Sequence, residues 1–166
     1  MDSSEIQVHD NKYLFFNVSM GVGKTYSTMQ YLNENRDTYK RVLWVCNRIS
    51  LGRNIYGDIN KHNTEQPFMF YKDVQGELGE RWKDMNDEHK YARLGKCDRL
   101  ICEVESLRHI NPTNYDCVVA DECESLFLSF NTDATHGKTG ENYWDNYNNF
   151  ELTLKMSKKV LLMDAF

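Results

Sequence analysis

The chain has 166 residues, of which 40% are hydrophobic and 27% are charged. This length and composition fit one soluble globular domain with its own core and exclude an intrinsically disordered protein. The formal net charge of −5 at pH 7 argues against a dedicated nucleic-acid-binding module, which is usually basic, but it allows a protein that holds a strand on part of one surface.

In the first half of the chain, apolar runs rich in β-branched and aromatic residues alternate with segments of helical spacing. The predicted strands cover residues 13–18 and 41–46, and the helices that follow them cover residues 24–34 and 50–62. Residues 68–71 are a candidate for a further strand. The apolar runs are nearly continuous rather than alternating, which is typical of strands covered on both faces.

The second half of the chain continues this alternation. Predicted strands cover residues 99–103, 116–120 and 160–163, and predicted helices cover residues 105–110 and 143–156. The charged residues 73–95 fit helices or an excursion from the fold equally well, and residues 131–141 are the clearest loop. We therefore predict one α/β domain over residues 1–166, with a mainly parallel sheet and helices on both faces.

Nothing in the sequence suggests export or a membrane anchor. No apolar run is long enough to span a bilayer, and the first five residues do not begin a signal peptide. The five cysteines are odd in number and contain no CxxC pair, and Cys97 and Cys102 lack the partners of a zinc site. We expect reduced thiols, no metal–thiolate site and an intracellular location.

The strongest local signal is a phosphate-binding loop between the first predicted strand and the first predicted helix. Glycines let the backbone curl so that successive N–H groups point at phosphates, and the helix N-terminus adds positive potential. The residues expected to bind the nucleotide are Ser19, Met20, Gly21, Val22, Gly23, Lys24 and Thr25. Lys24 would reach the β- and γ-phosphates of ATP, and the Thr25 hydroxyl would ligate Mg²⁺. The strict pattern has glycine where this chain has Val18, so a glycine-rich turn without a ligand is the alternative.

An acidic pair supplies the second element that nucleotide hydrolysis requires. Asp121 and Glu122 follow a predicted buried strand, which places them at the carboxyl end of the sheet, the same edge as the phosphate loop. Asp121 would sit in the magnesium shell, and Glu122 would act as the general base that activates water. The alternative is a helix N-terminus whose dipole the two carboxylates complement.

Together with three further motifs, these elements resemble a superfamily 2 helicase. The motifs are Asn-Arg-Ile-Ser-Leu at residues 47–51, Glu-Ser-Leu at residues 105–107 and Met-Asp-Ala at residues 163–165. The combination is most similar to the helicase portion of herpesvirus-type replication origin-binding proteins of large DNA viruses, and the similarity runs over residues 13–165. It implies a RecA-like P-loop NTPase fold, the first of two motor domains, acting in viral DNA replication.

The resemblance also implies how a strand would be held. Strand phosphates of single-stranded or duplex DNA, or of RNA, would be contacted by Arg48, Ser50 and Ser106. The alternative for Arg48 is a solvated loop arginine, and the alternative for Ser50 is a helix N-cap. The arginine fingers of such enzymes belong to a second motor domain, which these 166 residues do not contain. We therefore expect ATP binding with very slow hydrolysis. The role of Glu124, where better-known branches carry other residues, stays open.

Two other functions compete with the helicase reading. A small P-loop kinase would need a lid with several arginines, and residues 120–166 contain none. A truncated paralogue could bind nucleotide or nucleic acid without turnover, but such a role gives no reason to keep Lys24, Asp121 and Glu122.

Overall fold

A computed structural model describes residues 11–17, 19, 23–62, 66–130 and 141–164. Within these residues the chain forms one six-stranded sheet in which every paired strand is parallel, in the order β1-β6-β5-β2-β4-β3. The strands are β1 (Tyr13–Asn17), β2 (Val42–Cys46), β3 (Met69–Phe70), β4 (Arg99–Glu103), β5 (Cys117–Asp121) and β6 (Lys159–Asp164).

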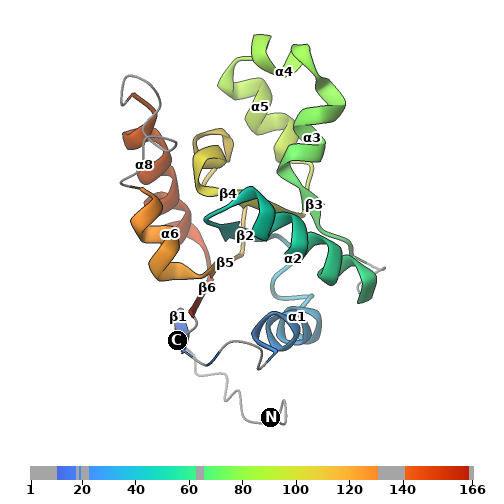
Figure 1. The fold of residues 1–166 in the computed structure, drawn as a ribbon, viewed down its shortest axis with the longest axis vertical. Coiled ribbons are helices and arrows are strands. Elements are labelled where there is room, and N and C mark those ends of the chain that lie inside the picture. The colour runs from blue at the N-terminus through green and yellow to red at the C-terminus, as the bar shows by residue number, and fades with distance from the viewer. Residues whose placement is uncertain (1–10, 18, 20–22, 63–65, 131–140, 165–166) are drawn as a thin grey trace.

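Helices cover both faces of the sheet (Figure 1). They are α1 (Lys24–Glu34), α2 (Ile49–His62), α3 (Tyr71–Leu78), α4 (Glu80–Asp84), α5 (Asp87–Leu94), the 3-10 helix η2 (Val104–His109), α6 (Cys123–Ser129) and α8 (Glu141–Met156). α1 and α2 pack on one face. The other helices lie on the opposite face, where α3, α4 and α5 form a lobe of their own at the top of Figure 1.

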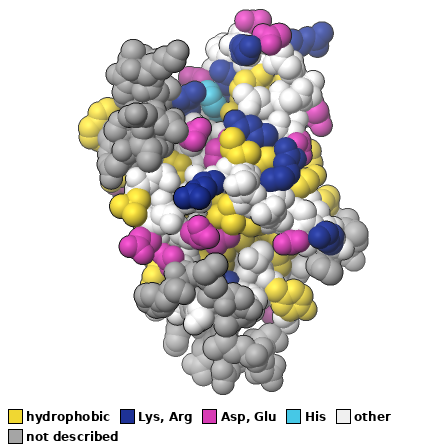
Figure 2. All heavy atoms as spheres, viewed as in Figure 1, with side chains coloured by type: hydrophobic (Ala, Val, Ile, Leu, Met, Phe, Trp, Pro, Cys, Tyr) yellow, Lys and Arg dark blue, Asp and Glu magenta, His cyan; other side chains and the backbone are white. Residues whose placement is uncertain are grey.

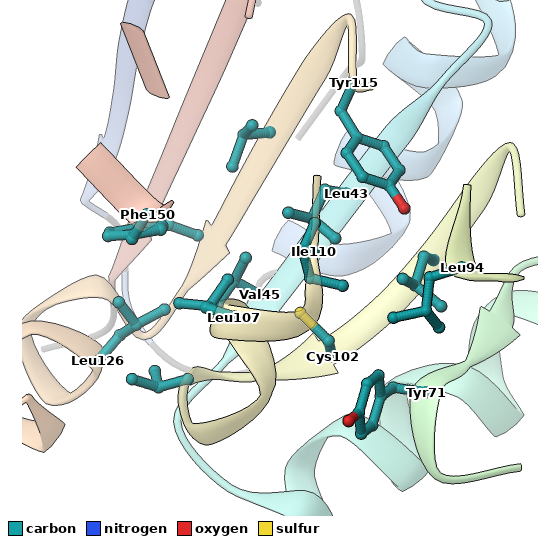
Figure 3. Packing of buried hydrophobic residues seen from close by; sticks show 14 of the residues in the cluster. Leu43, Val45, Tyr71, Leu94, Cys102, Leu107, Ile110, Tyr115, Leu126 and Phe150 are labelled. Atoms are coloured by element: carbon teal, nitrogen blue, oxygen red, sulfur yellow. The ribbon is translucent and has the colours of Figure 1, made fainter. Parts of the chain in front are cut away.

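Each central strand contributes to two hydrophobic cores. Leu43 and Val45 of β2 point to the core under η2, α6 and α8, which Figure 3 shows, whereas Trp44 of the same strand points to the core under α1 and α2. Because successive side chains of a strand point to opposite faces, a strand buried on both sides must be apolar at every position. This explains the continuous apolar runs of the sequence.

The described structure confirms the predicted α/β architecture and shifts several boundaries. The central strands agree with the prediction to within one residue at each end, and α1 agrees at both ends. The candidate strand at residues 68–71 is shorter, because Tyr71 already begins α3. The charged stretch 73–95 is helical, as α3, α4 and α5, and α6 is a helix that the sequence did not predict. The predicted loop lies outside the described residues except for Glu141.

No helix among the described residues is both long and apolar enough to cross a membrane.

Candidate functional site

The predicted phosphate loop and the predicted acidic pair meet at one edge of the sheet. All paired strands are parallel, so the carboxyl ends of β1 and β5 lie at the same edge, with only β6 between them. Two strand spacings amount to about 10 Å. A bound triphosphate with its metal ion can span such a gap, so the two elements are placed to share one ligand.

The N-terminus of α1 directly follows the predicted phosphate loop. Gly23 precedes α1 with φ at 82°, a left-handed conformation that glycine adopts at low cost, and its carbonyl accepts the first bond of the helix from Ser27 at 2.9 Å. Among the described residues no side chain caps this end, and its first turn contains no acidic residue. Lys24 and Thr25 follow, half-buried, and line a cavity of about 900 Å³ between α1 and α2.

The predicted phosphate loop is described only in part. Ser19 is described and exposed. Val18, Met20, Gly21 and Val22 lie outside the described residues, so the path of the loop around the phosphates stays a prediction.

Asp121 ends β5 as a buried carboxylate. It is 7% exposed, and this burial is the main reason why its pKa rises to about 6. The nearby charge of Glu122 raises the pKa as well. The charge of Lys24 and the Glu122 backbone N–H, which donates to Oδ1 at 3.0 Å, act in the opposite direction. The indole N–H of Trp44 also lowers this pKa, although its geometry falls short of a hydrogen bond.

Glu122 has an uncommon backbone conformation for a non-glycine residue. Its φ is 50° and its ψ is 56°, and it stands directly before α6 without capping the helix through its side chain. The left-handed region costs a residue with a Cβ about 1–2 kcal/mol. Such strain clusters at functional sites, and here it leaves a half-buried carboxylate at the carboxyl edge next to Asp121.

Asp164 joins the last strand to the acidic motif. From the end of β6 it accepts a hydrogen bond from the backbone N–H of Glu124 at 2.9 Å, and the Cys123 thiol lies 3.5 Å from the same oxygen. This carboxylate therefore caps α6 from a neighbouring strand. The sequence motif contained Asp164 but did not reveal this contact, because 40 residues separate the partners.

The residues proposed for strand contact follow two neighbouring strands. Arg48 and Ser50 are exposed at the start of α2, after β2, and Ser50 lies inside the helix, one residue past its first. The N-cap alternative for Ser50 is therefore wrong. Ser106 follows β4, which pairs with β2, but it is buried and its hydroxyl donates to Oε1 of Glu103 at 3.0 Å.

Basic side chains near Ser106 were missed in the sequence. The same Glu103 oxygen pairs with Lys72 of α3 at 2.9 Å. Lys72, Lys90 and Arg108 line a cavity of about 400 Å³ that also includes Ser106. Lys and Arg side chains gather on this face over α2 and below the α3–α5 lobe (Figure 2). Of these three, only Lys90 lies in the charged stretch 73–95, and no motif marks Lys72 or Arg108.

The described residues contain no group of three or more His, Cys, Asp or Glu side chains able to hold a metal ion by themselves. Magnesium in nucleotide sites takes one or two protein ligands and completes its shell with phosphate and water. The hydroxyl of Thr25 and the carboxylate of Asp121 are hard oxygen donors of the required kind, so the residues present fit this ion.

Comparisons with known proteins show the family and agree with the fold. Residues 3–159 match the family described as type III restriction enzyme, res subunit (ResIII). A putative replication origin-binding protein of Acanthamoeba polyphaga mimivirus is 26% identical over 155 residues, which is 88% of this chain and 17% of that protein. The Pyrococcus furiosus Hef helicase domain superposes with a TM-score of 0.56 over 94% of this chain and 29% of that one, at 13% identity, and so shows a shared fold.

Proposed function

Because the chain belongs to the ResIII family, that of the res subunit of type III restriction enzymes, we propose that it is an ATP-binding, magnesium-dependent motor domain of a superfamily 2 DNA helicase of the replication origin-binding type. One observation carries the proposal: the N-terminus of α1 and the pair Asp121 and Glu122 lie at one edge of the sheet, with Lys24 close enough to lower the pKa of Asp121.

The chain would hold the phosphates of ATP mainly through its backbone. The N-terminus of α1 would supply backbone N–H groups and the positive end of the helix dipole. The loop residues that would add further amides are Ser19, Met20, Gly21, Val22 and Gly23. The ammonium group of Lys24 would contact the β- and γ-phosphates.

Thr25 and Asp121 would hold the metal ion, and Glu122 would act as the general base. Magnesium, when bound there, would neutralise negative charge on the phosphates during transfer. Asp121 must be ionised for this role, and the raised pKa that burial gives it means that the site favours a cation. Glu122 would orient the attacking water and accept its proton.

The strand would run across the exposed start of α2. Arg48 and Ser50 stand there beside a helix N-terminus without acidic residues in its first turn, a suitable site for strand phosphates. Ser106 would act close by, at the turn that its hydroxyl holds against Glu103. DNA is the proposed partner, and an RNA strand of equal length is the comparison to make.

The whole protein's activity belongs to this proposal. The chain spans 17% of the length of the mimivirus relative, and the resemblance implies that the arginine fingers would belong to a second motor domain. An arginine finger contributes about 10³ to 10⁵ in rate. These 166 residues alone would therefore bind ATP and hydrolyse it slowly, and the second motor domain would be their partner.

All five cysteines are free and buried, which supports the proposal that the protein works in a reducing compartment, such as the cytoplasm, the nucleus or a viral replication compartment.

Titration calorimetry with magnesium and ATP tests the proposal directly. We expect Lys24→Ala to abolish binding, whereas Lys155→Ala, which removes an exposed lysine on α8 paired with Glu151, should leave it unchanged. Equal affinity of the two variants would refute the ATP site. Single-turnover hydrolysis with and without single-stranded DNA then separates a motor domain from a paralogue that binds nucleotide or nucleic acid without turnover. Phosphoryl transfer from ATP to a panel of nucleosides would instead reveal a kinase.

A further inference from the structure

A basic cavity lies between the α3–α5 lobe and η2. It has a volume of about 400 Å³, and side chains of all four helices line it. Its cations are Lys72, Lys83, Lys90 and Arg108. Among the described residues its wall contains one acid, Glu105. A concave surface with such an excess of positive charge attracts polyanions.

The sheet places this cavity beside the start of α2. Cys46 of β2 pairs with Glu103 of β4, so the segments that follow these two residues begin about 5 Å apart, the spacing of neighbouring strands. The first segment carries Arg48, and the second carries Ser106, which lines the cavity. Lys and Arg side chains lie together over α2 and below the lobe (Figure 2). A strand that crosses the start of α2 can therefore continue into the cavity.

A buried histidine holds Arg108 in place. The Nε of Arg108 donates to Nε2 of His109 at 3.2 Å, which requires a neutral ring because arginine can only donate. His109 is packed parallel to Tyr71 and edge-on to Trp82, with ring centres 6.4 and 5.8 Å away. Burial is the main reason why the pKa of His109 falls to about 4, and the charges of Arg108 and Lys90 lower it further. The ring is therefore neutral at pH 7, and it orients an arginine whose two Nη groups have no hydrogen-bond acceptor among the described residues.

The lysines of the cavity differ in whether an acid already neutralises them. Lys72 pairs with the buried carboxylate of Glu103 at 2.9 Å. Lys83, at the exposed rim, pairs with Glu80 of its own helix at 2.9 Å. Lys90 is half-buried with its ammonium group 5.7 Å from the ring centre of an indole, and it has no anionic partner among the described residues. Lys90 is thus the lysine of this cavity that is available to an external anion.

The aromatic rings of the cavity are covered, which identifies the part of a nucleic acid that it fits. Tyr71 is 2% exposed and Trp82 is 4% exposed, so neither offers a face on which a base can stack. Lysine and arginine bind phosphate oxygens without regard to sequence. We propose that the cavity is a second contact surface for a nucleic-acid backbone, in which Lys90 and Arg108 bind phosphates of the strand held at Arg48. This inference rests on the proposed function, because it extends the same strand onto the α3–α5 lobe.

Fluorescence anisotropy with a labelled single-stranded DNA, between about 50 and 200 mM salt, measures the contribution of the cavity. Replacing Lys90 and Arg108 together by glutamine should weaken binding about tenfold at the lower salt concentration. It should also reduce the slope of log affinity against log salt by about 1.4, since each phosphate contact on a single strand contributes about 0.7. The matched control is Arg36→Gln with Lys155→Gln, which removes one arginine and one lysine at exposed positions outside the cavity and should leave the slope nearly unchanged.

A gain of affinity separates a lost contact from a misfolded variant. Glu105→Gln removes the acid from the cavity wall, and because this acid repels phosphates, the variant should bind the strand about two- to fivefold more tightly. Misfolding does not produce such a gain. If the variant of Lys90 and Arg108 bound like its control pair, or if Glu105→Gln bound no more tightly than the natural protein, the proposal would be overturned.

Arg48→Ala and magnesium–ATP calorimetry distinguish failure of this inference from failure of the proposed function. A slope that falls in Arg48→Ala but not in the variant of Lys90 and Arg108 would overturn the inference and leave the proposed strand contact at α2. The reverse result would support the cavity and remove the contact at α2. Absence of strand binding with intact ATP binding would overturn the inference and keep the ATP site. Polyglutamate at an equal concentration of negative charge should compete poorly, and competition equal to that of DNA would overturn the inference by assigning the cavity to an acidic protein.

Discussion

The carboxylate of Asp164, at the end of β6, accepts a hydrogen bond at 2.9 Å from the backbone N–H of Glu124, in the helix that follows the neighbouring strand β5. The contact caps a helix of seven residues that begins directly after the acidic pair. Its consequence is mechanical: the end of β6 and the start of α6 cannot move independently while the bond is in place.

Replacing Asp164 by alanine should therefore destabilise the domain and slow hydrolysis. Loss of a helix cap costs about 1 kcal/mol, which urea denaturation would measure as a lower midpoint at unchanged slope. Asp164→Asn keeps an acceptor oxygen and should recover most of the stability. If Asp164→Ala were as stable as Asp58→Ala, which removes an exposed carboxylate of α2, the cap would have no energetic role.

The buried carboxylate of Asp121 should make both stability and magnesium binding depend on pH. Its pKa is about 6 in the folded chain and 3.8 as the ordinary value, so between these values the folded state holds more protons than the unfolded state. Without metal, stability should therefore fall as pH rises from about 4 to 6, by on the order of 3 kcal/mol, and stay constant above that range.

Asp121→Asn has no proton to exchange and should lose this dependence, becoming more stable than the natural protein at pH 7 without magnesium. Affinity for magnesium and ATP should show the reverse trend in the natural protein, weakening below about pH 6 as Asp121 is protonated. Denaturation and calorimetry from pH 4.5 to 8 would measure both effects. A flat stability profile in the natural protein would contradict the raised pKa.

How far the sequence predicts the fold depends on the kind of signal. The strands were predictable because each central strand is buried on both faces, so that Leu43, Trp44 and Val45 must all be apolar. The α3–α5 lobe was not, since its helices bury few side chains, such as Tyr71 and Trp82, and leave mixed charges on the rest. Short charged helices have no strong periodicity to read.

The residues of the candidate site also differ in how well the sequence predicts them. Residues within a contiguous motif, such as Lys24 and Asp121, could be identified because their chemistry and spacing occur together. Contacts between distant segments could not: Asp164 accepts a hydrogen bond from the backbone N–H of Glu124, 40 residues away, and Lys72 of α3 pairs with Glu103 at the end of β4. Neither is encoded in local spacing.

Glu122→Gln should separate ATP binding from hydrolysis. The variant keeps the size and hydrogen-bonding capacity of the side chain but removes the base, so single-turnover hydrolysis should fall by about 10² to 10⁴ with affinity for magnesium and ATP nearly unchanged. Glu124→Gln is the matched control, an exposed acid in the first turn of the same helix. Equal losses in both variants would mean that Glu122 does not act as the base.

Arg48→Ala should weaken strand binding without changing sequence preference. An arginine on a strand phosphate contributes to affinity through released counterions, so its loss should lower affinity uniformly across sequences and reduce the slope of log affinity against log salt by about 1. Arg53→Ala is the control, because Arg53 lies on the same helix but pairs with Asp73 at 2.7 Å. Fluorescence anisotropy with a single-stranded DNA and an RNA of equal length, between 50 and 200 mM salt (about the range over which phosphate contacts respond most), measures both quantities. Identical salt slopes for the natural protein and Arg48→Ala would exclude a phosphate contact at this residue. A larger loss of affinity for one of the two strands would show which nucleic acid the start of α2 holds.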